Sequence, residues 1–262
     1  MTAWEMVAVA AAGLAAGGIN AVVGSGTLVT FPVLLAVGLP PVTATITNSL
    51  GLVPGNLTGA IGYRRELQGQ RRMLVQLLPA SLLGALTGAF LLLHLPASAF
   101  EAIVPALVGL AVVLVAVQPL LQRRLAARRV RAGTVEEEQG IGPGRLAGLF
   151  AGAYVTGTYG GYFAASQVVL QIGIFGLLLR EPLQRLNAIK NVLTLAVNAV
   201  AALAYVVVAT ERIDWRAAAL VAGGALVGGY VGSTFGRRLP AALLRTAIVV
   251  LGLIAIWVLL RG

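Results

Sequence analysis

No charged residue occurs between Glu5 and Arg64, and much of the remaining chain is divided into further uncharged runs. Crossing the hydrocarbon core of a bilayer, which is about 30 Å thick, takes about 20 residues of α-helix. The further runs reach or approach that length, and they cover residues 102–122, 146–179, 191–210, 217–236 and 246–260. Only 11% of the residues are charged, against about 25% in an average soluble domain. The runs lack the alternation of barrel strands, so the sequence predicts an all-α integral membrane protein.

The charge balance and the rare residue types exclude several classes of protein. The net charge is +10, but the arginines lie in short loops between apolar runs, which is typical of cytoplasmic anchoring rather than of nucleic-acid binding. The chain has no cysteine and only one histidine, His94, so neither a disulfide framework nor a zinc cluster is expected. It also lacks a phosphate-binding loop of the Walker type. We therefore expect no metal, no cofactor, no enzymatic activity and no ATP-driven transport by this chain alone.

The two halves of the chain share a pattern of small and polar residues. The matching positions are Gly13-Leu14 and Gly17 with Gly148-Leu149 and Gly152, Asn48 with Asn191, and Gly84, Gly88 and Pro96 with Gly228, Gly232 and Pro240. Such self-similarity indicates an internal duplication. We predict a first membrane repeat at 1–121, a charged cytoplasmic linker at 122–143 and a second membrane repeat at 144–262.

Each half is expected to contain one long segment broken by glycines, followed by three ordinary spans. The broken segments cover 3–38 and 144–179, and the ordinary spans cover 41–63, 72–95, 98–121, 183–209, 214–236 and 240–261. A continuous helix of about 35 residues would be about 50 Å long, too long for one crossing even when tilted. Each long segment must therefore break, either as a hairpin that returns to its own side or as a pair of short spans. The N-terminal MTAWEMVAVA lacks the features of a cleaved signal, so we expect the first run to be permanent.

The loop charges predict that the two halves have opposite orientations. The loop 63–72 carries four arginines, whereas its counterpart 209–216 has two that are offset by two acids. The turns 37–42 and 94–98 carry no Lys or Arg, whereas their counterparts 178–185 and 236–240 carry two arginines each. We expect the loops 63–72, 122–145, 178–185 and 236–240 to be cytoplasmic and both termini to lie outside. Eight single spans with both termini inside remain the alternative.

Inverted repeats with interrupted helices at matching positions indicate a secondary transporter whose substrate binds between the repeats. A helix that starts inside the membrane presents free N–H groups and the positive end of its dipole, which suits an anion. At Gly24-Ser25-Gly26-Thr27 the backbone can approach a ligand closely. The pairs of glycines four residues apart, Gly84 with Gly88 and Gly228 with Gly232, are instead expected to pack helices together.

The candidate substrate-binding residues are the small and polar residues of the broken segments and of the spans that follow them. They are Asn20, Gly24, Ser25, Gly26, Thr27, Asn48, Ser49, Asn56, Thr158, Tyr159, Gly160, Gly161, Tyr162, Gln167, Lys190, Asn191 and Asn198. Thr156 and Gly157 are expected to face the ligand together with Thr158 to Tyr162, and Thr30, Thr47, Ser166 and Gln171 are weaker candidates. An ionisable residue inside a membrane span, such as Lys190, indicates a functional site. The alternative for Lys190 is that its side chain extends to the lipid headgroups. His94, which precedes Pro96 at a span end, is expected to be interfacial.

These motifs resemble the TauE/SafE family, also called the sulfite exporter family. The resemblance rests on GGINAVVGSGTLVTFPVLLAVGLPPVTATITNSL at 17–50, with Pro32 and the Leu39-Pro40 pair in the expected places, and on GAYVTGTYGGYFAASQVVLQIGIFG at 152–176. Two departures are Ser25, at a position that is often glycine, and Ser166-Gln167, near where the first half has Pro32. The resemblance implies export or uptake of small sulfur-containing anions such as sulfite or organosulfonates.

The sequence therefore predicts a multi-pass secondary transporter in the plasma membrane that moves small sulfur-containing anions. Coupling to protons has no obvious carrier, because Glu5, Glu101 and Glu181 lie at expected span ends, so a uniporter or a channel-like pathway stays open. A non-transporting scaffold or accessory subunit is the alternative from another class. The expected partners are membrane lipid and a small anion; protons and a second copy in a homodimer are further candidates, and nucleic acid is not expected.

Overall fold

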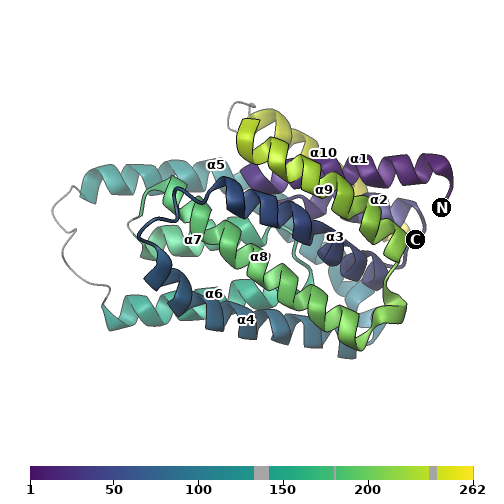
Figure 1. Ribbon diagram of the computed structural model, residues 1–262, viewed down its shortest axis with the longest axis horizontal. Coiled ribbons are helices and arrows are strands. Elements are labelled where there is room, and N and C mark those ends of the chain that lie inside the picture. Colours follow the sequence, from purple (N-terminus) through teal and green to yellow (C-terminus); the bar gives the residue numbers. More distant parts are fainter. Residues whose placement is uncertain (133–141, 180, 236–240, 262) are drawn as a thin grey trace.

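The computed structural model of the chain describes residues 1–132, 142–179, 181–235 and 241–261. Within these ranges every regular element is a helix, as the sequence predicts. The elements are α1 (Ala3–Val22), α2 (Thr27–Ala36), α3 (Pro41–Gly62), α4 (Arg71–His94), α5 (Ala97–Ala132), α6 (Pro143–Tyr162), α7 (Gln167–Leu178), α8 (Leu183–Val208), the 3₁₀ turn η1 (Thr210–Arg212), α9 (Trp215–Phe235) and α10 (Ala241–Arg261). The long helices lie side by side along the longest dimension of the molecule (Figure 1).

Both glycine-broken segments fold as helical hairpins, each a longer helix followed by a short one. In the second hairpin, Gly148 near the start of α6 lies against Leu178 at the end of α7, and Gly152 lies against Ile174. Helix α7 therefore runs back along α6. In Figure 1, α2 returns from the end of α1 in the same manner, and the two hairpins enter the molecule from opposite ends. At about 15 to 18 Å, α2 and α7 are too short to cross a bilayer.

The two hairpin turns use different backbone conformations. In the first turn Gly24 has a φ of 90°, in the left-handed region where glycine carries little penalty. In the second turn the left-handed residues are Ala164, with a φ of 63°, and Ser166, with a φ of 61°. Residues other than glycine seldom adopt this conformation, and such strained positions concentrate at functional sites.

Helix α5 is longer than the sequence predicts. Its expected end is residue 121, but the helix continues to Ala132, because residues 122–132 are mostly arginine, alanine and leucine and contain neither glycine nor proline. The start of the predicted linker is therefore helical.

Three predicted segments fall wholly or partly outside the described residues. They are residues 133–141 of the linker, Arg180 in the predicted loop 178–185, and the predicted loop 236–240. The other predicted spans match the observed helices to within two residues.

Glycines bring helices of the two halves into backbone contact. A Cβ atom at Gly84 or Gly88 of α4 would collide with the carbonyl groups of α6, and one at Gly228 or Gly232 of α9 would collide with those of α1. This confirms the predicted packing role of both glycine pairs. Because α4 packs against α6 and α9 packs against α1, each half supplies a helix to the other's hairpin.

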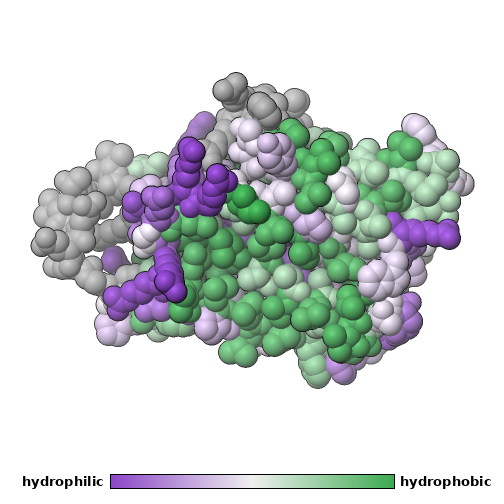
Figure 2. Space-filling view, viewed as in Figure 1, coloured by the Kyte–Doolittle hydropathy of each residue, from purple (hydrophilic) through white to green (hydrophobic). Residues whose placement is uncertain are grey.

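Five described helices are long and apolar enough to cross a membrane: Ala3–Val22, Arg71–His94, Ala97–Ala127, Gln184–Val208 and Trp215–Thr234. Helix α3, expected as an ordinary span, is long enough but too polar to be counted with them. Its polar side chains point into the protein, since Thr45, Thr47, Asn48, Ser49 and Asn56 are all buried. Figure 2 shows hydrophobic surface across the middle of the visible face and hydrophilic residues gathered toward its ends. The chain is a multi-pass membrane protein.

Candidate functional site

The turns of the two hairpins meet inside the protein. The Ser166 hydroxyl lies 3.1 Å from the Ser25 hydroxyl, although the two serines are 141 positions apart in the sequence, and both side chains are buried. Beside them Gly24 lies against Val168, where a side chain at residue 24 would collide with the valine. Because α2 and α7 begin just after these turns, the N-terminal ends of two short helices converge in the interior. Such ends carry free N–H groups and partial positive charge.

Helix α5 supports both turns from one side. The Ser166 hydroxyl lies 3.3 Å from the carbonyl oxygen of Ala111, and the Gln118 side-chain nitrogen donates to the Val23 carbonyl over 3.3 Å. Gln118 was missed by the sequence analysis. It is an amide inside an otherwise apolar run, and that isolation is the signal that could have identified it.

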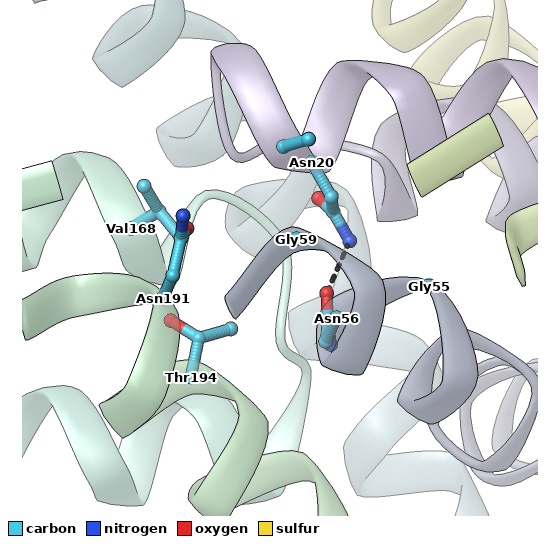
Figure 3. A pocket seen from close by; sticks show the side chains of 8 residues that line it. Asn20, Gly55, Asn56, Gly59, Val168, Asn191 and Thr194 are labelled. Carbon is cyan, nitrogen blue, oxygen red and sulfur yellow. Dashed lines mark hydrogen bonds between the residues drawn. The ribbon is translucent and has the colours of Figure 1, made fainter. Parts of the chain in front are cut away.

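A small internal cavity lies next to the turns (Figure 3). It is lined by α1, α3, α7 and α8, through Asn20, Ala21, Gly55, Asn56, Gly59, Val168, Asn191 and Thr194. Its room is about that of one water molecule. Three of the candidate residues, Asn20, Asn56 and Asn191, therefore come together from both halves of the chain. An ion larger than one water molecule would enter this cavity only if its lining moved apart.

Two amide side chains connect the cavity to the first hairpin. The Asn20 oxygen accepts from the Gly26 N–H over 2.7 Å, next to the start of α2, and the Asn20 nitrogen donates to the Asn56 oxygen over 3.2 Å (Figure 3). The second polar atom of Asn56, its nitrogen, is buried without a partner in the described residues. The Asn191 nitrogen is likewise unpartnered. Buried donors normally have a hydrogen-bond partner. These two N–H groups of the lining are therefore available to an acceptor on a ligand.

Further unpartnered polar groups lie on α7 and α8. The Thr194 hydroxyl donates to the Gln171 oxygen over 3.0 Å, which leaves the Gln171 nitrogen without a partner. Neither amide atom of Gln167, the first residue of α7, has a partner, and the same is true of the Lys190 ammonium nitrogen. All four side chains are buried within the described part of the chain. Lys190 therefore does not reach solvent in the protein.

Several predicted site residues instead hold helices together. The Asn48 oxygen accepts from Thr30, and its nitrogen donates to Thr27 over 3.2 Å, so Asn48 ties α3 to α2. Thr47 accepts from the Asp214 N–H over 3.1 Å, which joins α3 to the start of α9. Ser49 and Asn198 are buried on α3 and α8 but do not line the cavity. For these residues a role in substrate binding stays a prediction.

The glycine-rich part of α6 faces α4 more than the cavity. Gly157 and Gly161 lie against Ser81 and Ala85 of α4, and Thr156 and Thr158 donate to carbonyl groups of α6 itself. Gly160 lies against the Gln167 side chain. The hydroxyls of Tyr159 and Tyr162 are buried without partners, and the Tyr162 ring packs edge-on against Phe100. This segment therefore does not line the cavity.

The histidine and the acidic side chains are scattered over the part of the chain that the structure describes. No group of three or more His, Cys, Asp or Glu side chains there could hold a metal ion. His94 lies at the end of α4, where its ring stacks on Phe90 and its Nδ1 lies 3.0 Å from the Phe90 carbonyl oxygen. This exposed position fits the interfacial role expected for it.

Comparison with known proteins gives a family match over nearly the whole chain. The model of the family described as "Sulfite exporter TauE/SafE" matches residues 9–259. The chain is also similar to a protein of Haemophilus influenzae described as "Probable membrane transporter protein", with 31% identity over 96 residues. That alignment spans 37% of this chain and 38% of the relative, well under two thirds of its length. No solved structure matches the chain.

Proposed function

The chain belongs to the TauE/SafE sulfite exporter family of membrane transporters, and on that premise we propose that it is a secondary transporter of small sulfur-containing anions, such as sulfite or an organosulfonate. The proposal places it in the plasma membrane. It is a transporter by family rather than an enzyme. The substrate class follows from the family name and from the donors of the cavity, not from a bound ligand.

One observation carries the proposal: the two hairpin turns meet beside a cavity whose unpartnered groups are donors. Ser25 and Ser166 mark the convergence of the α2 and α7 N-termini, and Asn56 and Asn191 contribute free N–H groups. Interrupted helices that direct their positive ends into the membrane are the arrangement by which transporters hold anionic groups. We assign the substrate to this cavity and extend the site to the nearby residues Gly24, Gly26, Thr27 and Gln167.

The paired architecture supports transport by inverted repeats. Helices α1 and α6 both have 20 residues, and α2 and α7, the short arms of the hairpins, have 10 and 12. The hairpins enter from opposite ends (Figure 1), and the contact of α1 with α9 has a counterpart in that of α6 with α4. In this mechanism the two repeats rock about the closed cavity and open it to one side at a time.

The proposed topology places both termini outside and the basic loops in the cytoplasm. A hairpin that returns to its own side supports this arrangement, because the three spans that follow then end each repeat on the side opposite its start. Reporter fusions at residues 1 and 262 test it. A reporter that is active only outside the cytoplasm is expected to be active at both ends. If instead a reporter that is active only inside the cytoplasm is active at both ends, the eight single spans are favoured.

Flux into proteoliposomes tests transport itself. We expect sulfite or a simple organosulfonate to enter vesicles that contain the purified chain, and an opposing pH gradient to change the rate if protons are coupled. A rate that ignores the gradient would favour a uniporter or a channel-like pathway. An absence of flux for every small anion tested, with retained binding to a partner protein, would instead favour the scaffold alternative. A homodimer is compatible with each of these outcomes.

A further inference from the structure

Lys190 is the one charged side chain that is buried among the described residues. Its exposed fraction is 1%, and its ammonium nitrogen has no hydrogen-bond partner. It is also the only lysine of the chain. Arg185, on the same helix and about one turn earlier, is half exposed and forms an ion pair with Glu181 at 3.2 Å. One cation of α8 therefore has its counter-ion, and the other has none.

Lys190 does not itself line the cavity, but it lies next to residues that do. It directly precedes Asn191 and lies one helical turn before Thr194, and both of these residues line the cavity. Residues four apart share a face of a helix, so Lys190 and Thr194 lie on the same buried side of α8. Gln171, which is bonded to Thr194, adds an unpartnered N–H group on α7. The neighbourhood contains a cation and several donors.

No acidic side chain balances this charge from within the described residues. None of the Asp and Glu side chains there is buried; they are Glu5, Glu66, Glu101, Glu181, Glu211 and Asp214, which lie in loops or near helix ends. A buried charge without a counter-charge costs free energy, and in a membrane span it is retained where function needs it. An anionic ligand would supply the missing negative charge.

We infer that the transported anion is the counter-ion of Lys190, and that the site therefore selects sulfonates and related oxyanions that carry no ammonium group. This rests on the proposed function and narrows its substrate class. A zwitterionic aminosulfonate would place its own ammonium group near a second cation. The described residues there offer it amide oxygens such as that of Gln167, but no carboxylate. Leaving that charge unpaired weakens binding on the order of 100-fold.

The test uses two ligands that differ only in the charged group. Ethanesulfonate and taurine have the same two-carbon sulfonate body, and taurine adds the ammonium group. The melting temperature of the purified full-length chain is measured with each, since a ligand that binds the folded state raises it. Ethanesulfonate is expected to stabilise the chain at concentrations about 100-fold below those at which taurine does. Equal effects of the two ligands would overturn the inference but leave anion transport standing, whereas no effect of any sulfonate or of sulfite would contradict both.

Variants of α8 separate binding from folding. Lys190→Met should abolish the shift with ethanesulfonate while raising the melting temperature of the ligand-free protein, because an unpaired buried charge has been removed. Arg185→Met, which removes an exposed cation of the same helix, should keep the full ligand shift. Lys190→Arg retains the charge and should keep a preference for ethanesulfonate over taurine. A full ligand shift in Lys190→Met would refute the role of Lys190.

Discussion

The two hairpin turns make the same reversal inside the membrane by different means. The first uses Gly24 in the left-handed conformation and fixes the start of α2 through the hydrogen bond from Gly26 to Asn20. The second uses Ala164 and Ser166 in that conformation. The first turn is thus relaxed and tied by an amide, whereas the second is strained.

Because of this difference, substitutions in the two turns should have different effects on stability. A left-handed residue other than glycine costs about 1 to 2 kcal/mol, so the second turn stores free energy that the surrounding contacts must hold. One of those contacts is the hydroxyl of Ser25 in the first turn. The relaxed turn therefore supports the strained one, and changes in the two turns should differ in size and even in sign.

The largest effect is expected for Gly24→Ala. The new methyl group would collide with the Val168 side chain, including its Cβ atom, in a left-handed backbone that alanine disfavours. We expect a loss of about 2 to 4 kcal/mol in the free energy of unfolding and a loss of transport. Unfolding in mixed micelles and flux into proteoliposomes measure the two. Gly38→Ala is the control, because Gly38 has a φ of 89° but open space around it, and it should lose only about 1 kcal/mol.

Asn20→Ala tests the amide tie of the first turn. It removes the acceptor of the Gly26 N–H and the donor to Asn56, so we expect a loss of about 1 to 2 kcal/mol in the free energy of unfolding and much slower flux. Thr2→Ala, which removes an exposed cap at the start of α1, should cost about 1 kcal/mol or less and leave flux unchanged. Normal flux in Asn20→Ala would show that this tie does not shape the site.

The sequence predicts the helices and the amide side chains of the cavity better than it predicts the hydrogen bonds that join one helix to another. Uncharged runs set the spans, and glycine clusters set the breaks, because both depend on local properties of the chain. Asn56 and Asn191 were found since polar residues in an apolar span are rare. The partner of each polar group depends on long-range packing. The link from Asn48 to Thr30 could therefore not be predicted, and nor could the Val23 carbonyl as the partner of Gln118. The left-handed Ala164 leaves no mark in the sequence, because alanine usually occupies helices.

A double-mutant cycle measures how strongly the two turns are coupled. Ser25→Ala and Ser166→Ala each remove one side of the same contact, while Ser166 also loses its approach to the Ala111 carbonyl. We expect a coupling free energy of about 0.5 to 1.5 kcal/mol in the unfolding of the single and double variants. Additive losses would mean that the turns are adjacent but independent. The same cycle with Ser25→Ala and Thr87→Ala, whose hydroxyl is exposed on α4, should give no coupling.

The smallest effect in the two turns, a stabilising one, is expected for Ala164→Gly. Glycine adopts a φ of 63° without the steric penalty of alanine, so the strain of the second turn is relieved. Part of that gain is offset by the greater freedom of the unfolded chain, which leaves a net gain of about 0.5 to 1 kcal/mol in the free energy of unfolding. Ala165→Gly, at a neighbouring residue without a left-handed φ, should lose stability instead. Because a strained turn also holds the start of α7 at the site, Ala164→Gly should slow flux while it stabilises the protein. Unchanged flux would show that the strain has no part in transport.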